Sequence, residues 1–264
     1  MKGQSHKFAA FDSFWAVSWH FKLLLLLLLF LPVITERPYN HEDIVAVIGE
    51  VLSNPLVNGV VSIRVIAKII LAVACTVCLI YKDGRIILLY YAAVGCAVAI
   101  FQNMAQTQYG FTILPGNMAV QLVVAVYCLF FVLKDGITRA NAVNRNAVWV
   151  VPLMIFAFLM PYQIRDGIIV PSLRGVFTNE SAVTYCMIAP VVLGMLLLVS
   201  NHALPVIHAI SFVAFLFALL NMMTHFVFAS HNWWMGVLHL PLLFISAYGM
   251  VISRNRQGDR RRGN

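Results

Sequence analysis

The sequence predicts an all-α, polytopic membrane helix bundle with about eight transmembrane helices. The first observation is composition: 61% of the 264 residues are hydrophobic and only 11% are charged, whereas a soluble domain carries about 25% charged residues. The second is a mean hydropathy of +0.87, which implies more apolar surface than one soluble core of this size can bury. The third is a series of apolar runs near the length of about 20 residues that crosses a bilayer.

Eight such runs divide the chain, and each is expected to be a helix because lipid cannot satisfy an open sheet edge. They occupy residues 14–34, 59–81, 86–106, 118–134, 148–163, 182–200, 206–228 and 235–253. Most connections between them are short, which favours antiparallel packing of sequence neighbours. We therefore expect a single integral-membrane domain over residues 1–264, in contact with the lipid bilayer.

The distribution of Lys and Arg predicts the orientation, because cytoplasmic loops of membrane proteins are enriched in both. Only Arg37, Arg165 and Arg174 fall on one side of the predicted bundle. Both termini are therefore expected in the cytoplasm, at a cell (inner or plasma) membrane, with residues 254–264 as a basic cytoplasmic tail. The net charge of +8 then reflects contact with anionic lipid, and no nucleic-acid partner is predicted. The basic residues assigned to the cytoplasmic side are Lys2, Lys7, Lys22, Lys82, Arg85, Lys134, Arg139, Arg145, Arg254, Arg256, Arg260, Arg261 and Arg262.

The first apolar run resembles a signal peptide in having a basic flank and a short leucine series, Leu23 to Leu29. Val33 and Thr35 do not form the pair of small residues that a cleavage site needs. We therefore expect this run to remain as an anchor.

The two longest segments on the outer side also carry signals. Within 35–58, Glu42 and Asp43 precede an apolar face, which predicts a short amphipathic helix at about 40–53. Within 164–181, the triplet Asn179-Glu180-Ser181 matches the glycosylation pattern, which has meaning only in a eukaryotic secretory pathway.

Arg64 and Lys68 are the most informative polar pair. They are four residues apart and so share one helix face, at depths of about 7–8 Å and about 13–14 Å if the span begins at residue 59. A cation near the midplane costs about 2.5–3.5 kcal/mol, and no Asp or Glu lies deep in any predicted span. An anionic group from outside the protein would offset this cost. The simpler alternative is that the span begins after Arg64 and that Lys68 extends to the surface.

These residues support a first functional hypothesis, a transporter or permease that accommodates a small anionic solute or a lipid headgroup. Arg64 and Lys68 would attract the anion. Gln102 and Asn103, at the outer end of the third span, would help to bind it, with His225 as a further orienting group. The alternative for amides in this position is hydrogen bonding between helices.

The histidines support a second hypothesis, a membrane enzyme or an electron carrier. His225, His231 and His239 lie near the outer ends of the last two spans, where they could form a metal site. Alternatively, His20 facing His208 and His225 facing His239 would give two pairs of haem ligands. The sequence predicts no cofactor firmly, since histidines in spans are more often hydrogen-bond partners between helices.

The remaining motifs are weak or absent. Cys75 and Cys78 form a C-x-x-C pair, but no second pair completes a zinc site. The chain lacks a P-loop, H-E-x-x-H and G-x-S-x-G, so no catalytic residue is identified. A third hypothesis is therefore a noncatalytic subunit whose polar stripes pack against membrane-protein partners.

Overall fold

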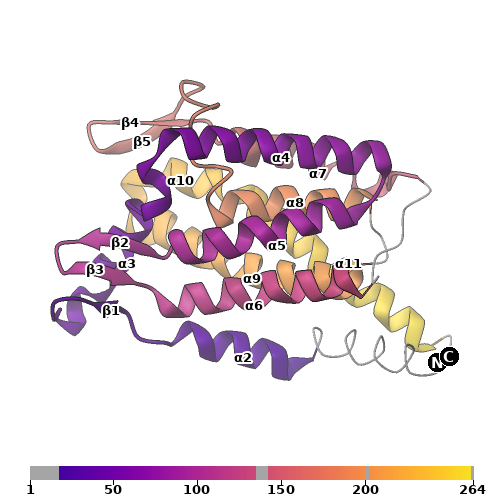
Figure 1. The fold of residues 1–264 in the computed structure, drawn as a ribbon, viewed down its shortest axis with the longest axis horizontal. Helices are drawn as coiled ribbons and strands as arrows, with labels where there is room; N and C mark the ends of the chain where they lie inside the picture. Colours follow the sequence, from indigo (N-terminus) through magenta and orange to yellow (C-terminus); the bar gives the residue numbers. More distant parts are fainter. Residues whose placement is uncertain (1–17, 135–141, 200–202, 263–264) are drawn as a thin grey trace.

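The computed structural model describes residues 18–134, 142–199 and 203–262. The helices lie side by side along the long axis of the molecule, and the strands gather at one end (Figure 1). The first part of the bundle contains α2 (Trp19–Leu29), α4 (Val61–Tyr81), α5 (Gly84–Phe101) and α6 (Pro115–Leu133). The second contains α7 (Val150–Leu159), α8 (Tyr185–Val199), α9 (Leu204–Met223), α10 (Trp233–Leu238) and α11 (Leu240–Arg262).

Helices occupy parts of all eight predicted ranges, which supports the all-α prediction, but eight spans are not confirmed. Within the described residues, only α4, α5, α6 and the segment Leu204–Phe228 are single helices long and apolar enough to cross a membrane. A fifth candidate is a pair of helices, Ser230–Leu238 and Leu240–Asn255, bent by 48°. The other apolar helices, α2, α7 and α8, have only 11, 10 and 15 residues.

Local backbone features explain why some predicted spans are shorter than expected. After α7, Met160 adopts a left-handed conformation with φ of 47°, and Pro161 follows, so the helix cannot continue. After α5, the chain turns at Gln102 and Asn103 and enters strand β2 (Met104–Thr107).

Two small antiparallel sheets form the end of the bundle that carries the strands. Strands β1 (Ile34–Thr35) and β2 both pair with β3 (Gly110–Ile113), in the order β1-β3-β2. Strands β4 (Tyr162–Arg165) and β5 (Ile168–Pro171) form a separate hairpin. Its turn residues, Asp166 and Gly167, both have positive φ, as the tight Asp-Gly hairpin turn requires.

The amphipathic segment expected at about 40–53 contains helix α3 (Ile44–Ser53), preceded by a 3-10 turn at His41–Asp43. Its buried residues are Val47 and Val51. Three carboxylates bind the neighbouring β2–β3 hairpin: Glu36 accepts from Phe111 N, Glu50 accepts from Gln108 N, and Asp43 accepts from the Tyr109 hydroxyl.

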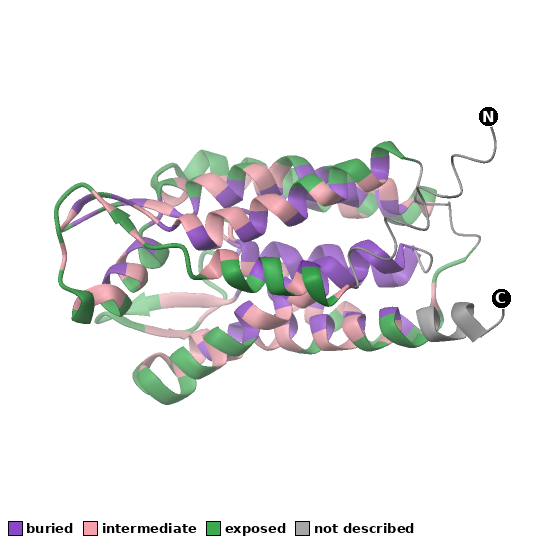
Figure 2. Ribbon diagram, turned by 90° about the horizontal axis from the view of Figure 1, so that it is seen from below, coloured by how far each residue is buried: buried purple, intermediate pink, exposed green. Residues whose placement is uncertain are grey.

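Helix α8 is the centre of the core. Every residue of α8 except Cys186 is buried, and a buried helix is visible inside the bundle in Figure 2. It packs against α5, α7, α9 and α11, and Gly194 allows close approach, since a Cβ there would lie 2.2 Å from the Met154 sulfur. Helix α4 is peripheral, since only 22% of its most apolar 18-residue stretch is buried. The polar residues that attach α4 to the bundle therefore bear directly on function.

Candidate functional site

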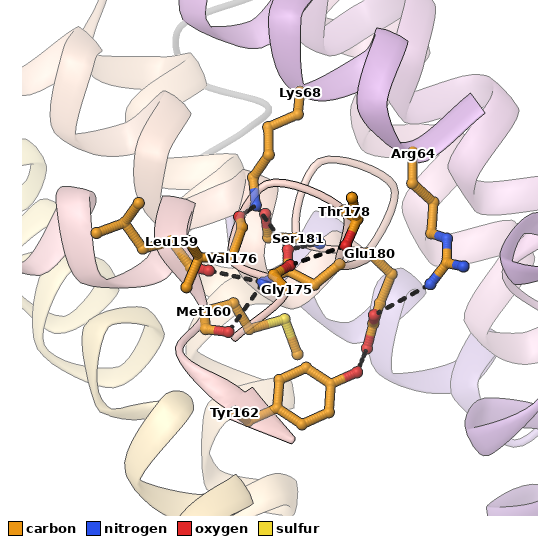
Figure 3. Close-up of polar contacts among 11 residues, drawn as sticks. Arg64, Lys68, Leu159, Met160, Tyr162, Gly175, Val176, Thr178, Glu180 and Ser181 are labelled. Atoms are coloured by element: carbon orange, nitrogen blue, oxygen red, sulfur yellow. Dashed lines mark hydrogen bonds and ion pairs between the residues drawn. The ribbon is translucent and has the colours of Figure 1, made fainter. Parts of the chain in front are cut away.

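Lys68 of α4 is buried and hydrogen-bonded within the chain. It is 4% exposed, and its Nζ donates to Asn179 Oδ1 at 2.6 Å and to the carbonyl of Val176. The same ammonium lies 5.3 Å from the centroid of the Phe158 ring, a cation–π contact. Figure 3 shows the side chain extending from α4 to the loop 172–184. Lys68 therefore neither reaches bulk solvent nor lacks partners.

The carbonyls at the end of α7 are bonded by side chains from later in the sequence. Such carbonyls have no partner within their own helix, and they give its C-terminus a partial negative charge. This end lies beside the Lys68 ammonium, so it stabilises the buried cation (Figure 3). The bonds, of 2.7–2.9 Å, run from Ser181 Oγ to Phe158 O, from Asn179 Nδ2 to Leu159 O and Met160 O, and from Trp234 Nε1 to Pro161 O.

Glu180 supplies the acid at this place. Its Oε2 lies 3.9 Å from Arg64 Nη1, and the side chains are 13% and 21% exposed. The hydroxyl of Tyr162 donates to the other carboxylate oxygen. Burial raises the pKa of Tyr162 above its ordinary value, and the charge and hydrogen bond of Glu180 raise it further. Tyr162 is therefore held in its neutral, hydrogen-bonding form. We call the following residues the Lys68 cluster: Arg64, Lys68, Tyr162, Asn179, Glu180 and Ser181.

The expectation that Arg64 and Lys68 have no acidic partner in the chain is wrong. The acid comes from the loop before α8 and not from a span, so a search of the spans alone could not find it. The sequence signal for this acid was the polar triplet Asn179-Glu180-Ser181, which directly precedes the predicted span 182–200. Asn179 is 8% exposed and its amide already bonds the end of α7, so the folded chain uses this asparagine for structure and does not present it for glycosylation.

Gln102 and Asn103 also make structural contacts. Gln102 Oε1 accepts from Tyr185 N at 2.8 Å, which caps the first turn of α8. Asn103 is fully buried, and its Nδ2 donates to Ala99 O. Its Oδ1 is buried without a partner. The hydrogen bonds and ion pairs of the described residues do not join either amide to Arg64 or to Lys68.

His225 and His239 are brought together by the fold. Their ring centroids are 6.0 Å apart and the ring planes differ by 21°, which agrees with the expectation that these two histidines face each other. His239 is 6% exposed, and its Nδ1 lies 2.7 Å from the Met235 carbonyl. A carbonyl only accepts, so this nitrogen carries the proton and the lone pair is on Nε2. We call His225 and His239 the histidine pair.

One buried ring nitrogen of the histidine pair makes no hydrogen bond. His225 Nδ1 is buried with no partner, which costs about 1–3 kcal/mol unless another group satisfies it. His239 Nε2 likewise has no hydrogen bond among the described residues.

Breaks in both helices position the histidine pair. His225 lies in a π-helical turn, Thr224–Phe228, that continues α9 and is closed by a bond from Ala229 N to Thr224 O. Such turns are frequent at functional sites. His239 lies at the bend between α10 and α11. Gly236 permits the approach, because a Cβ there would lie 2.7 Å from the Phe226 ring.

The other histidines make different contacts. His231 is exposed in the 3-10 turn Ser230–Asn232. Within the described residues, no group of three or more His, Cys, Asp or Glu side chains is placed to hold one metal ion. His20 is exposed beside Trp19, whereas His208 is 3% exposed and bonds Ser253 Oγ at 2.9 Å. The predicted His20–His208 haem pair therefore has no support in these contacts.

Comparison of the chain with protein-family models, curated proteins and solved structures found no match.

Proposed function

We propose that the chain is an integral membrane protein that binds a transition-metal ion between His225 and His239, as a metal carrier or an electron carrier. The observation that supports this most directly is the unmade bond of the histidine pair. The two imidazoles are stacked with their centroids 6.0 Å apart; His225 has its Nδ1 buried and unbonded, and His239 has its Nδ1–H held by a carbonyl. Metal-binding histidines commonly donate their second ring nitrogen to a carbonyl in this way.

The anion-transport hypothesis has less support from the contacts. Lys68 donates to two oxygens and lies beside the C-terminus of α7. Glu180 opposes the charge of Arg64. The remaining support for an anionic solute or headgroup is that two cations meet one carboxylate, and that Arg64 Nε is buried without a partner. The exposed apolar face of α4, including Ile66 and Ile69, fits contact with lipid and contact with a partner helix equally, so it does not favour a role as an assembly subunit.

Metal content of the purified full-length protein tests the proposal. The protein is stripped with a chelator in detergent, reloaded with copper or zinc, freed of excess metal and analysed by mass spectrometry. We expect about one ion per chain in the wild type and in His41→Gln, a control in the exposed turn before α3. His225→Gln and His239→Gln should contain none. Equal metal content in all four proteins, or none in any, would contradict the proposal. Circular dichroism confirms that the variants fold.

A further inference from the structure

We infer that the end of the bundle away from the strands binds the phosphate group of one anionic phospholipid, through Lys22 of α2 and Arg254 of α11. The inference is independent of the metal proposal. The histidine pair shares no residue with this site and lies toward the end that carries the strands, where α10 packs against β5.

This end of the bundle carries an excess of positive charge, and we call it the basic end. Figure 1 shows that α2, α11 and the turn between α4 and α5 reach it. Among the described residues at this end, Asp83 is the only acid, and it caps α5 by accepting from Arg85 N at 3.0 Å. The described cations of the basic end are Lys22, Lys82, Arg85, Lys134, Arg145 and Arg254.

Contacts between helices bring two of these cations to one place. The Lys22 Nζ lies 5.6 Å from the centroid of the Phe212 ring of α9, a cation–π contact. One turn earlier on α9, His208 is buried and its Nδ1 lies 2.9 Å from Ser253 Oγ of α11. Arg254 directly follows Ser253, and it is close enough to act electrostatically on both Lys22 and His208. The first and last described helices of the bundle therefore each place a cation beside the same part of α9.

The surroundings of Lys22 make this arrangement unfavourable unless an anion joins it. Lys22 is the fourth residue of α2 and is followed there by seven leucines. Its ammonium is half-buried against an aromatic ring and has another cation as its charged neighbour. Like charges repel, more strongly where water is partly excluded, and a cation in an apolar segment is costly unless it is paired. A phosphate group offsets both costs, because its oxygens accept charge-assisted hydrogen bonds from ammonium and guanidinium groups.

The apolar surface around Lys22 favours a lipid over free phosphate. Trp19, one turn before Lys22, and Trp149, at the start of α7, are both exposed at the basic end, and Trp is enriched at the headgroup level of a bilayer. Lys22 is therefore near the depth of lipid phosphates. Farther along α2, Leu23 and Leu27 are exposed. A lipid whose phosphate binds Lys22 can lay an acyl chain along these leucines, whereas free phosphate makes no use of them.

Native mass spectrometry of the full-length protein in detergent tests the inference. The probes are phosphatidylglycerol as the anionic lipid, phosphatidylcholine as the zwitterionic lipid and inorganic phosphate as the free anion. We expect one phosphatidylglycerol to bind about tenfold more tightly than phosphatidylcholine, and excess inorganic phosphate should not displace it. Lys22→Gln and Arg254→Gln should each lower the affinity for phosphatidylglycerol about fivefold.

Two further variants separate this site from the general charge of the basic end. Lys22→Arg keeps the charge and should bind phosphatidylglycerol as the wild type does. Lys82→Gln removes one charge from the turn between α4 and α5, and α4 and α2 lie at opposite edges of the bundle in Figure 1. Because salt screens charges that are far apart, Lys82→Gln should change the affinity by less than about twofold. Circular dichroism confirms that all four variants fold.

Each contrary outcome overturns a stated part of the inference. Equal affinity for the two lipids, or unchanged affinity in both Lys22→Gln and Arg254→Gln, would show that these cations hold no phosphate. A loss in Lys82→Gln as large as in Lys22→Gln would replace the site with diffuse attraction to the basic end. Displacement of the lipid by inorganic phosphate would make the free anion the ligand and overturn the assignment to a lipid. None of these results bears on metal binding by the histidine pair.

Discussion

The Lys68 cluster and the histidine pair are both polar groups inside an apolar bundle, yet they differ in how their hydrogen bonds are met. Lys68 and Asn179 make two and four bonds respectively within the chain. His225 Nδ1 makes none. Buried polar groups are costly unless they are paired. The bonds of Lys68 and Asn179 therefore explain these two residues as structure, whereas the unbonded His225 Nδ1, like the unbonded Arg64 Nε, leaves room for a further partner. The sequence points first to Arg64 and Lys68 as a ligand-binding site. Because His225 Nδ1 has no hydrogen-bond partner, we regard the histidine pair as the stronger candidate.

The largest effect on stability should come from Lys68→Met, which breaks the paired cluster. The change leaves Val176 O and Asn179 Oδ1 without their charged donor, so we expect a loss of about 2–4 kcal/mol in the free energy of unfolding. Denaturant unfolding in detergent measures it, with Ile66→Met on the exposed face of α4 as the control. A loss equal to that of the control would show that the cluster does not hold α4.

The next largest effect concerns the approach of α10 to the π-helical turn. Gly236→Ala places a methyl group 2.7 Å from the Phe226 ring, and Phe226 adjoins His225 in sequence. We expect the affinity for the metal ion to fall by about tenfold with unchanged stoichiometry. Gly49→Ala, where a Cβ meets no atom within 4 Å, is the matched control and should not change affinity. An unchanged affinity in Gly236→Ala would mean that the ring spacing does not depend on this contact.

A smaller effect concerns the contribution of Tyr162 to the free energy of unfolding, which should depend on pH. Because its pKa is raised in the folded protein, its contribution to stability is complete below the ordinary pKa of about 10 and is lost as pH rises towards the raised value. Tyr162→Phe should therefore cost about 0.5–1.5 kcal/mol near pH 8 and progressively less above pH 10. Glu180→Gln should lower the pKa of Tyr162, measured by phenolate absorbance. An unshifted titration in Glu180→Gln would place the cause in burial alone.

The smallest effect should come from His231→Gln. The sequence predicts His231 as a third metal ligand, but it is exposed in a separate turn. We expect metal stoichiometry to remain the same and affinity to change by less than about twofold. A loss of metal as complete as in His239→Gln would restore the three-histidine site.

The prediction of the fold was most accurate where local hydropathy decides the structure. Helices α4, α5 and α6 lie within or close to the predicted ranges because each is a long apolar run. The errors in the predicted helix ranges occur at helix ends, where a short backbone feature decides where the helix stops. Met160 with positive φ stops α7, and the Asp166-Gly167 turn forms a hairpin in the outer segment 164–181, where no strand was predicted.

The prediction of the sites failed for a different reason. Sequence reasoning placed Arg64 and Lys68 on one helix face, which the structure bears out in their shared cluster (Figure 3). It did not find Glu180, more than a hundred residues away, because a loop has no hydropathy period that fixes where it folds. It did raise the arrangement in which His225 faces His239 as one alternative that the topology permits, and the two rings lie in contact.

The sequence by itself determined that this protein is helical and apolar, and which few polar side chains must be accommodated. These properties follow from composition and from neighbours along the chain. Only the tertiary structure decided which of those side chains have partners, because the bonds of Lys68 depend on the loop 172–184, and the gap between His225 and His239 depends on two broken helices. Such contacts arise between distant segments, and no local pattern encodes their distance.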